Sequence, residues 1–238
     1  MNFIKNKQAL ENLKKPKAVV FDWDNTLVDT WPLIQTAIDE TMKKMGKEPW
    51  GLKKVRDNVH KSMRESFPEI FGDDWQKAGE IYKQTYRSLH LEKLYLLPGA
   101  LELIEKLEEM QITQFVVSNK MGPTLRQEAE KIGLDKKFFS LIGAGDAKAD
   151  KPSYLPVEMA LIGSDINLRQ DEIWFVGDTI ADIECAYNSG CTPIIYGNAV
   201  DNEISKTISQ NWIENGKNNE GPLPIYFHHH ELIELLKK

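Results

Sequence analysis

Cysteine is scarce in this chain, which has only Cys185 and Cys191 among its 238 residues. Two cysteines are too few for a disulfide framework, and their separation fits neither a C-x-x-C redox pair nor a zinc knuckle. We therefore expect both to be reduced and buried as small side chains. Because a chain of this length can bury a sizeable core, it is expected to fold without disulfides or a structural metal.

Long apolar runs and an excess of basic residues are also lacking. No stretch approaches the roughly 18 consecutive apolar residues that cross a bilayer, and the start of the chain has no apolar core of signal-peptide length. The sequence thus predicts a cytoplasmic protein without a membrane partner. Its net charge of −6 argues against general nucleic-acid binding, since phosphate backbones are bound mainly by clustered Lys and Arg.

Short runs rich in β-branched and aromatic residues recur along the chain, with helical patterns between them. Several are almost continuously apolar, as expected of strands covered on both faces. Their alternation with helices predicts an α/β fold, with a Rossmann-like three-layer core around a parallel sheet. The runs are residues 18–22, 112–118, 138–144, 172–178 and 192–197.

Over residues 30–96 the pattern changes, because helical periodicity continues there without a comparable strand. We expect these residues to form a small all-helical domain, inserted into an α/β core made of residues 1–29 and 97–238. Since the insert follows the first strand, its predicted role is a cap over the end of that strand. Three tryptophans are expected to pack the insert's own core: Trp31, Trp50 and Trp75.

Two polar segments near the end of the chain receive structural interpretations. Residues 214–224 are rich in Gly, Asn and Pro and are predicted to be a loop. The histidines at 228–230 directly precede an apolar-periodic stretch, so we expect them to open a helix rather than to bind a metal.

Polar and charged residues follow the ends of the predicted strands. In a parallel sheet, ligands bind beyond the carboxyl ends of the strands, so these side chains are predicted to meet in one pocket. Carboxylates that lie close together repel one another and lose hydration, and a cation or a chemical step has to compensate them. The residues are Asp22, Asp24, Ser118, Asn119, Lys151, Asp178 and Asp182.

Four short segments, in this order along the chain, resemble the motifs of the haloacid dehalogenase superfamily: DWDNTLVDT, Ser118 in VVSNK, Lys151 in KPS, and GDTIAD. The resemblance covers nearly the whole chain. The strand order in sequence and the helical insert after the first motif are similar to the branch that contains the phosphoglycolate phosphatases and β-phosphoglucomutase. The resemblance further implies that the main-chain carbonyl of Asp24 reaches the metal.

Phosphate-ester chemistry needs the residue types that stand at these positions. A phosphate monoester is an anion, so a carboxylate can attack it only when cations hold both, and Mg²⁺ does this with oxygen ligands. We predict Asp22 as the nucleophile that forms an aspartyl-phosphate and Asp24 as the general acid and base. Ser118 and Asn119 are predicted to hold phosphoryl oxygens, while Lys151 supplies a fixed positive charge.

The predicted magnesium ligands are Asp22, Asp24, Asp178 and Asp182. Asp182 is interpreted either as a ligand or as a partner that orients the ligands. Two residues depart from the family pattern. Asn25 stands where the family often has Gly, but Asn tolerates a positive φ, so the turn remains possible. Thr179 stands where many relatives have a second acid next to Asp178. Asp182 is therefore expected to be more important for the metal site.

Within the insert, residues 59–66 interrupt the helical pattern and carry three cationic residues. Relatives in this branch use a loop at a similar place to contact the leaving group of the substrate. His60, Lys61 and Arg64 are therefore predicted to bind substrate, in particular a second anionic group such as a carboxylate. A solvated basic helix end is the alternative interpretation.

The predicted function is a Mg²⁺-dependent phosphatase for a small phosphorylated metabolite, with phosphoglycolate and sugar phosphates as candidates, in a monomer or homodimer. A phosphomutase would use the same core, and a catalytically silent binding module would keep the fold without the chemistry. Dehalogenation is a weaker alternative, because a departing halide needs no proton and Asp24 would be idle.

Overall fold

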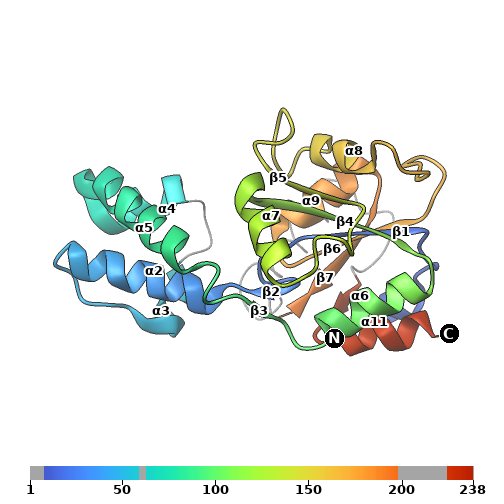
Figure 1. Cartoon of the computed structure of the whole chain (residues 1–238), viewed down its shortest axis with the longest axis horizontal. Helices are drawn as coiled ribbons and strands as arrows, with labels where there is room; N and C mark the ends of the chain where they lie inside the picture. The colour runs from blue at the N-terminus through green and yellow to red at the C-terminus, as the bar shows by residue number, and fades with distance from the viewer. Residues whose placement is uncertain (1–7, 59–62, 198–223, 238) are drawn as a thin grey trace. The chain divides into compact units, whose positions relative to one another are not determined.

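A computed structural model describes residues 8–58, 63–197 and 224–237 (Figure 1). The chain forms two compact units, one comprising Met1–Val28 with Leu96–Lys238 and the other Asp29–Tyr95. Among the described residues, no helix combines the length and the apolarity that crossing a bilayer requires. The cytoplasmic location stays a prediction.

The first unit is built on a six-stranded sheet in the order β5-β4-β1-β6-β7-β8, in which every neighbouring pair is parallel. The predicted α/β fold with a parallel sheet is therefore confirmed. The strands are β1 (Ala18–Phe21), β4 (Thr113–Met121), β5 (Ser140–Ala144), β6 (Ile173–Gly177), β7 (Thr192–Tyr196) and β8 (Ile225–Tyr226).

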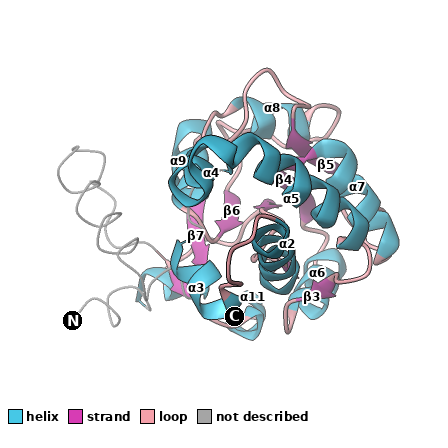
Figure 2. Ribbon diagram, turned by 90° about the vertical axis from the view of Figure 1, so that its left-hand side faces the viewer, coloured by secondary structure: helices cyan, strands magenta, loops and turns pink. Residues whose placement is uncertain are grey.

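Helices cover both faces of this sheet, which gives three layers (Figures 1 and 2). Helices α8 and α9 pack on one face, and α6 and α7 pack on the other, as right-handed crossovers require for this strand order. Helix α11, which follows the last strand, packs next to α6. The helices are α6 (Ala100–Glu109), α7 (Gly122–Lys131), α8 (Leu155–Leu161), α9 (Ile180–Ser189) and α11 (His229–Leu236).

The central strand β1 has side chains buried on both of its faces, since no residue of β1 is more than 1% exposed. Ala18 and Val20 share one core with residues of α8 and α9, including Val157 and Cys185. Successive residues of a strand point to opposite faces, so a strand between two helical layers needs the near-continuous apolar run that predicted it. Cys185 and Cys191 are buried and free, as expected.

Two strand predictions need correction. Strand β4 does not end at Ser118 but continues to Met121, and its pairing with β5 is irregular between Val117 and Met121. The polar residues of the second motif therefore lie on an extended strand end rather than beyond it. Strand β8 was missed, because two residues next to a polar segment give no usable periodicity.

The second unit is helical. It comprises α2 (Trp31–Lys44), α3 (Gly51–Asn58), α4 (Met63–Phe71), the short 3₁₀ helix η1 (Gly72–Asp74) and α5 (Trp75–Leu89). A core that includes Ile38, Met42 and Phe67 fills this unit, and the three tryptophans named for it pack against that core as predicted. Of the residues 59–66 that were expected to interrupt the helical pattern, residues 63–66 belong to α4, and residues 59–62 lie outside the described residues.

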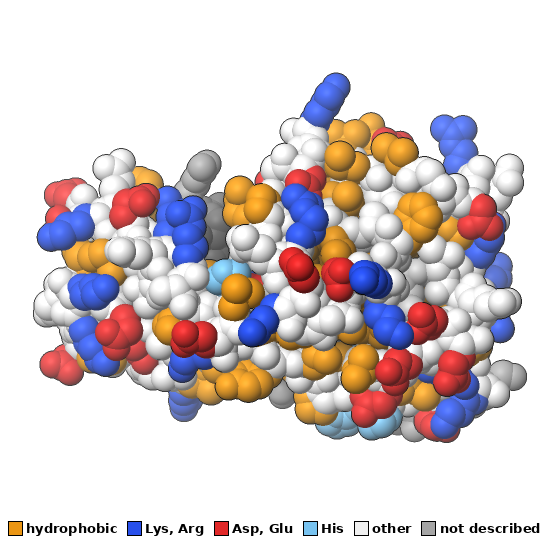
Figure 3. Space-filling model, in the orientation of Figure 1, with side chains coloured by type: hydrophobic (Ala, Val, Ile, Leu, Met, Phe, Trp, Pro, Cys, Tyr) orange, Lys and Arg blue, Asp and Glu red, His pale blue; other side chains and the backbone are white. Residues whose placement is uncertain are grey.

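Two short strands, β2 (Val28–Asp29) and β3 (Tyr95–Leu96), form a two-stranded sheet where the chain passes between the units. On the α/β unit, Lys and Arg side chains are interspersed with Asp and Glu side chains over the face seen in Figure 3. Apolar side chains gather on that face near α8, where Met159 and Ile162 are exposed.

Helix α11 begins after His228, as predicted, and Glu231 accepts hydrogen bonds there from the main-chain N–H groups of Phe227 and His228. The next residue, His229, is fully buried and lies with its Nε2 2.9 Å from the carbonyl oxygen of Thr26 in the loop after β1. A carbonyl can only accept, so Nε2 carries the hydrogen and Nδ1 accepts from the Tyr226 hydroxyl at 3.3 Å. Neutral His229 thus ties the C-terminal helix to the first motif.

Burial of His229 makes the stability of the protein depend on pH. Burial lowers the pKa of His229 to about 4, whereas the unfolded chain takes up this proton near its ordinary value of 6.5. Between these values the unfolded state binds more protons, so stability falls as the pH falls. We expect His229→Gln to remove about 2 kcal/mol of the stability difference between pH 7.5 and pH 5, measured by urea unfolding at both pH values.

Tyr226→Phe is the matched control, since it deletes the hydroxyl beside Nδ1 but leaves the imidazole buried. Because burial is the main cause of the shift, this variant should keep most of the pH dependence. An unchanged pH dependence in His229→Gln would show that other groups carry it.

Candidate active site

The candidate site lies beyond the carboxyl end of β1. Phe21 is in register with Val116 on β4 and with Val176 on β6, and the N–H of Asp22 donates to the carbonyl of Val176 at 2.8 Å. The helices that follow β4 and β6 lie on opposite faces of the sheet, so the direction of winding reverses here (Figure 2). Open α/β sheets form their ligand-binding crevice at such a position.

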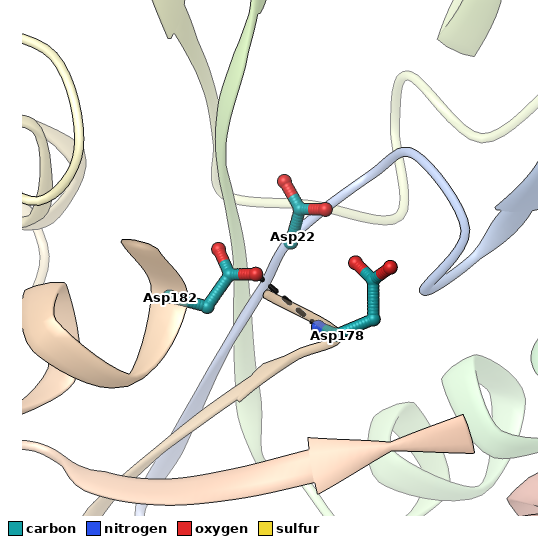
Figure 4. Close-up of side chains that lie close together, drawn as sticks. All are labelled: Asp22, Asp178 and Asp182. Atoms are coloured by element: carbon teal, nitrogen blue, oxygen red, sulfur yellow. Dashed lines mark hydrogen bonds between the residues drawn. The ribbon is translucent and has the colours of Figure 1, made fainter. Parts of the chain in front are cut away.

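Three carboxylates converge at this end of the sheet (Figure 4). Asp22, Asp178 and Asp182 each offer an oxygen, and these atoms all lie within 4.8 Å of one another. Asp22 follows β1 and Asp178 follows β6, while Asp182 lies in the first turn of α9. Asp22 and Asp182 are buried and Asp178 is half-buried. Three of the four predicted metal ligands are thus brought together.

Lys151 neutralises part of this cluster. Its Nζ lies 2.6 Å from Oδ1 of Asp22 and 2.6 Å from Oδ1 of Asp182. Burial alone lowers a lysine pKa, but the negative charges of Asp182 and Asp22 outweigh burial and raise the pKa of Lys151. Lys151 therefore carries a positive charge that is fixed beside the predicted nucleophile.

Asn119 holds the main chain of Lys151. Its side-chain Nδ2 donates to the carbonyl of Lys151 at 3.1 Å, and its Oδ1 accepts from the Lys151 N–H at 3.0 Å. These two bonds engage both ends of the amide, so the side chain of Asn119 orients Lys151. The predicted contact of Asn119 with a phosphoryl oxygen would then be made by its main-chain N–H group.

Asp182 is braced on both of its oxygens. Oδ2 accepts from the N–H of Asp178 at 3.2 Å, drawn in Figure 4, and from the N–H and the hydroxyl of Thr179 at 2.9 and 2.6 Å. Oδ1 accepts from Lys151. The close approach depends on Gly177, where an added Cβ would lie 2.4 Å from the Cβ of Asp182. Of its two predicted roles, this geometry favours the one in which Asp182 orients its neighbours.

The cluster carries more negative charge than Lys151 neutralises. Burial raises the pKa of Asp22 to about 6; the attraction of Lys151 opposes this shift, and repulsion from Asp182 and Asp24 adds to it. Burial, followed by repulsion from Asp22 and Asp182, raises the pKa of Asp178 well above its usual range. A divalent cation relieves such a site, and converging carboxylate oxygens are the donors that Mg²⁺ prefers. The residues therefore fit a magnesium ion held mainly by Asp22 and Asp178.

Asp24 is not one of these three carboxylates, and its side chain pairs with another lysine. Its Oδ1 is 2.6 Å from the Nζ of Lys120. Ser118 is buried, and its Oγ accepts a hydrogen bond from the N–H of Lys120 at 3.3 Å, which leaves the hydroxyl hydrogen to be donated to a ligand. Asn25 has a φ of 59°, so it takes the positive φ that was expected to be possible where the family often has Gly.

The predicted substrate contacts in the helical unit cannot be placed in this way. His60 and Lys61 lie outside the described residues, and for Arg64 the structure gives only its main-chain position in α4. Their roles stay predictions.

Sequence reasoning missed four residues that support the site. Thr26 donates its hydroxyl to Oδ1 of Asp178 at 3.3 Å. The other three are Trp23, Lys120 and Glu128, which form a buried network next to Asp24. One feature of the sequence could have indicated this network. Glu128 is charged, yet it stands on the buried face of α7 with Leu125 and Ala129.

Comparison with known proteins gives concordant results. Residues 19–195 match the family model of the haloacid dehalogenase-like hydrolases. The phosphoglycolate phosphatase of Chromobacterium violaceum is 27% identical over 195 residues, which cover 78% of this chain and 87% of that protein. The phosphoglycolate phosphatase of Pseudomonas fluorescens strain Pf-5 is 26% identical over 194 residues, which cover 76% of this chain and 70% of that protein.

Solved structures agree with this result. A haloacid dehalogenase superfamily hydrolase from Ehrlichia chaffeensis is 33% identical, with a TM-score of 0.54 and coverage of 87% of this chain and 100% of that chain. A haloacid dehalogenase-like family hydrolase from Streptococcus pneumoniae shares the fold, with a TM-score of 0.73 at 20% identity and coverage of 91% and 96%.

The chain therefore belongs to the haloacid dehalogenase-like hydrolases. The predicted resemblance to the branch that contains the phosphoglycolate phosphatases is confirmed, and with it the class of enzyme, a phosphatase.

Repulsion among the carboxylates of Asp22, Asp178 and Asp182 should lower the stability of the metal-free protein. Removal of one of these charges should therefore raise it. Because the pKa values of Asp22 and Asp178 are raised in the fold, their ionised forms disfavour folding at neutral pH. We expect Asp178→Asn to raise the melting temperature of the metal-free protein at pH 8, by about 2 to 4 °C for each kcal/mol of repulsion removed. This gain should shrink toward pH 6, where Asp22 takes up a proton.

Mg²⁺ should stabilise the wild type and leave Asp178→Asn almost unaffected, since ligand binding to the native state raises the melting temperature. Glu184→Gln removes an exposed charge from α9, the helix that follows Asp178, and serves as the control. It should behave like wild type in both measurements. A melting temperature of Asp178→Asn below that of wild type without metal would contradict the repulsion argument.

Removal of Lys151 should have the opposite effect on stability. Lys151→Met leaves Asp22 and Asp182 buried without their cation, and we expect a loss of about 3 to 5 kcal/mol in the free energy of unfolding at pH 7.5. Combination with Asp22→Asn should recover part of this loss in a double-mutant cycle. The exposed ion pair of Lys17 with Asp171 offers a control, because Lys17→Met should cost far less.

Proposed function

We propose that this phosphatase uses Mg²⁺ to hydrolyse a small phosphorylated metabolite, with Asp22 as the nucleophile. The arrangement of Asp22 supports this proposal best. Its carboxylate lies at the end of the central strand, beside the fixed positive charge of Lys151 and within reach of the same ion as Asp178. If the aspartates after β1 only formed a solvated turn, no buried lysine shared between Asp22 and Asp182 would be needed.

Asp22 and Asp24 divide the chemistry between them. An oxygen of Asp22 forms a bond to phosphorus while the bond from phosphorus to the leaving oxygen breaks, and Asp24 donates a proton to that oxygen. Water then attacks the phosphorus of the aspartyl-phosphate and gives a proton to Asp24. The bond between phosphorus and the Asp22 oxygen breaks, which releases inorganic phosphate and restores the Asp22 carboxylate.

Other residues of the site hold the reacting groups. Ser118 donates its hydroxyl hydrogen to a phosphoryl oxygen, and Lys151 provides positive charge where negative charge accumulates. The carboxylates of Asp22 and Asp178 and the main-chain carbonyl of Asp24 would hold Mg²⁺. When bound, this ion screens the charges of nucleophile and phosphoryl group from each other. Asp182 keeps Lys151 and the turn at Asp178 in place.

For the substrate, we propose phosphoglycolate ahead of sugar phosphates. The curated relatives are named phosphoglycolate phosphatases, and phosphoglycolate carries a carboxylate beside its phosphate. His60, Lys61 and Arg64 offer cationic side chains in the helical unit that would suit this second anion. We propose that residues 30–96 serve as a cap that excludes water before chemistry.

Activity of Asp22→Asn tests the role of the nucleophile. With p-nitrophenyl phosphate and Mg²⁺ we expect wild type to turn over and Asp22→Asn to lose about 10³-fold or more in kcat, because Asn cannot form the phosphoenzyme. The exposed Asp165→Asn variant should retain wild-type activity. Equal, negligible turnover of wild type and Asp22→Asn would favour a binding module without catalysis.

A panel of phosphate esters then addresses the substrate. Phosphoglycolate should give a higher kcat/KM than sugar phosphates, and Arg64→Ala should reduce this preference. Release of inorganic phosphate distinguishes a phosphatase from a phosphomutase, which would yield an isomer of its substrate. Unchanged relative rates across the panel in Arg64→Ala would count against Arg64.

A further inference from the structure

A second buried lysine lies on the other side of the first motif. Lys120 is on the extended end of β4, and its side chain is only 4% exposed. Its Nζ lies 2.6 Å from Oδ1 of Asp24 and 2.6 Å from Oε2 of Glu128 on α7. Glu128 is fully buried and also accepts a hydrogen bond from Nε1 of Trp23 at 2.8 Å. Trp23, Lys120 and Glu128 thus form a buried network that ends at the more exposed Asp24.

Packing of the core does not by itself explain a buried network of charged groups. A buried ion pair gives little net stability, because removing both charges from water costs about as much as their attraction returns. Apolar residues of similar size would serve packing at least as well. The network is informative because of its position, since Trp23 stands between Asp22 and Asp24 and Glu128 comes from a different helix.

Lys120 cannot contact substrate in this arrangement, because its Nζ is buried between two carboxylates. It can fix the position of Asp24. A carboxylate at a loop would otherwise move between side-chain conformations, and catalysis depends on holding the reacting groups near the geometry of reaction. Pairing through Oδ1 restricts the Asp24 side chain, so that Oδ2 would carry the proton exchanged with the leaving group.

We infer that Lys120, held by Glu128 and Trp23, is a positioning residue for Asp24 in the proton-transfer step of the reaction. This inference rests on the proposed role of Asp24 as general acid. It assigns the two buried lysines different tasks: Lys151 serves the nucleophile Asp22, and Lys120 serves the acid Asp24.

The leaving group of the substrate offers a direct test. An alkyl phosphate has a strongly basic leaving oxygen that needs a proton, whereas 2,4-dinitrophenyl phosphate releases a stable phenolate that does not. The constant kcat/KM reports the steps up to departure of the leaving group, so it isolates the acid role of Asp24. A defect in Asp24 or in its positioning should therefore be large for alkyl phosphates and small for the dinitrophenyl ester.

Lys120→Met alone leaves Glu128 buried without its cation and can unfold the protein, so the main test is the double variant Lys120→Met/Glu128→Gln. The amide introduced by Glu128→Gln cannot carry charge and still offers an oxygen to Trp23. We expect kcat/KM for phosphoglycolate or glycerol phosphate to fall at least about tenfold, and that for 2,4-dinitrophenyl phosphate to fall by less than about threefold. In Asp24→Asn the same contrast should be larger.

A third variant separates positioning from a general structural effect. Because Lys120 acts through Asp24, adding Asp24→Asn to the double variant should cause no loss beyond that of Asp24→Asn alone. Gln114→Met is the matched control, since Gln114 is a buried polar residue of the same strand that donates to Ile104 on α6. Any loss in Gln114→Met should be equal for both classes of ester.

Equal losses for both classes of ester in the Lys120→Met/Glu128→Gln variant would overturn the inference and leave the network a structural role. No loss at all would also overturn it. A flat response of Asp24→Asn would instead refute the acid role of Asp24, and inactivity of the wild type toward every ester would refute the proposed function itself.

Discussion

The structure depends above all on the compensation of buried negative charge at the carboxyl end of the sheet. Asp22, Asp178 and Asp182 occupy one small volume, and one buried ammonium, that of Lys151, bridges two of them. This balance is incomplete. A full set of protein cations would leave no place for the divalent cation that the proposed chemistry needs. Burial is the main cause of the raised pKa values of Asp22 and Asp178, and repulsion between the carboxylates adds to it. The incomplete compensation would lower the stability of the metal-free protein, and binding of a divalent cation would restore it.

The fold meets this requirement by collecting charged groups from distant segments onto one strand end. Asp22 follows the central strand, Asp178 follows its neighbour β6, and Lys151 comes from the loop before α8. Parallel strands make this possible, because all their carboxyl ends point the same way. Hydrogen bonds from Asn119 to the main chain of Lys151 and from Thr179 to Asp182 then remove the freedom that loops would otherwise have. Each of these contacts has a main-chain group as one partner, so it holds the loop itself and not only a side chain.

The sequence predicted this core well for a physical reason. Strand β1 is apolar throughout because helices cover both of its faces, and the residues that follow it change at once to carboxylates, so both the strand and its end are visible in the order of the residues. Gly190, in the left-handed conformation, ends α9, and Gly is the residue that most readily takes this conformation after a helix. Prediction was weaker where the pattern is short or mixed. The polar residues of β4 hide its true end at Met121, and the two residues of β8 are too few to show a period.

The residues that support the site were not predicted, because their burial is not what their side-chain types suggest. Lys120 and Glu128 look like surface residues by type, and His229 looks like one of three similar histidines, yet all three are buried. Only their neighbours in space explain this burial: Glu128 meets Trp23, Lys120 meets Asp24, and His229 meets the carbonyl of Thr26. Each of these contacts joins segments that are far apart in the sequence to the loop after β1. Periodicity reports whether a position faces inward, but a buried polar residue is satisfied only by its partner, and that partner is chosen by the tertiary fold. The first motif thus carries the chemistry that sequence reveals, while the residues that hold it in place become visible only when the chain is folded.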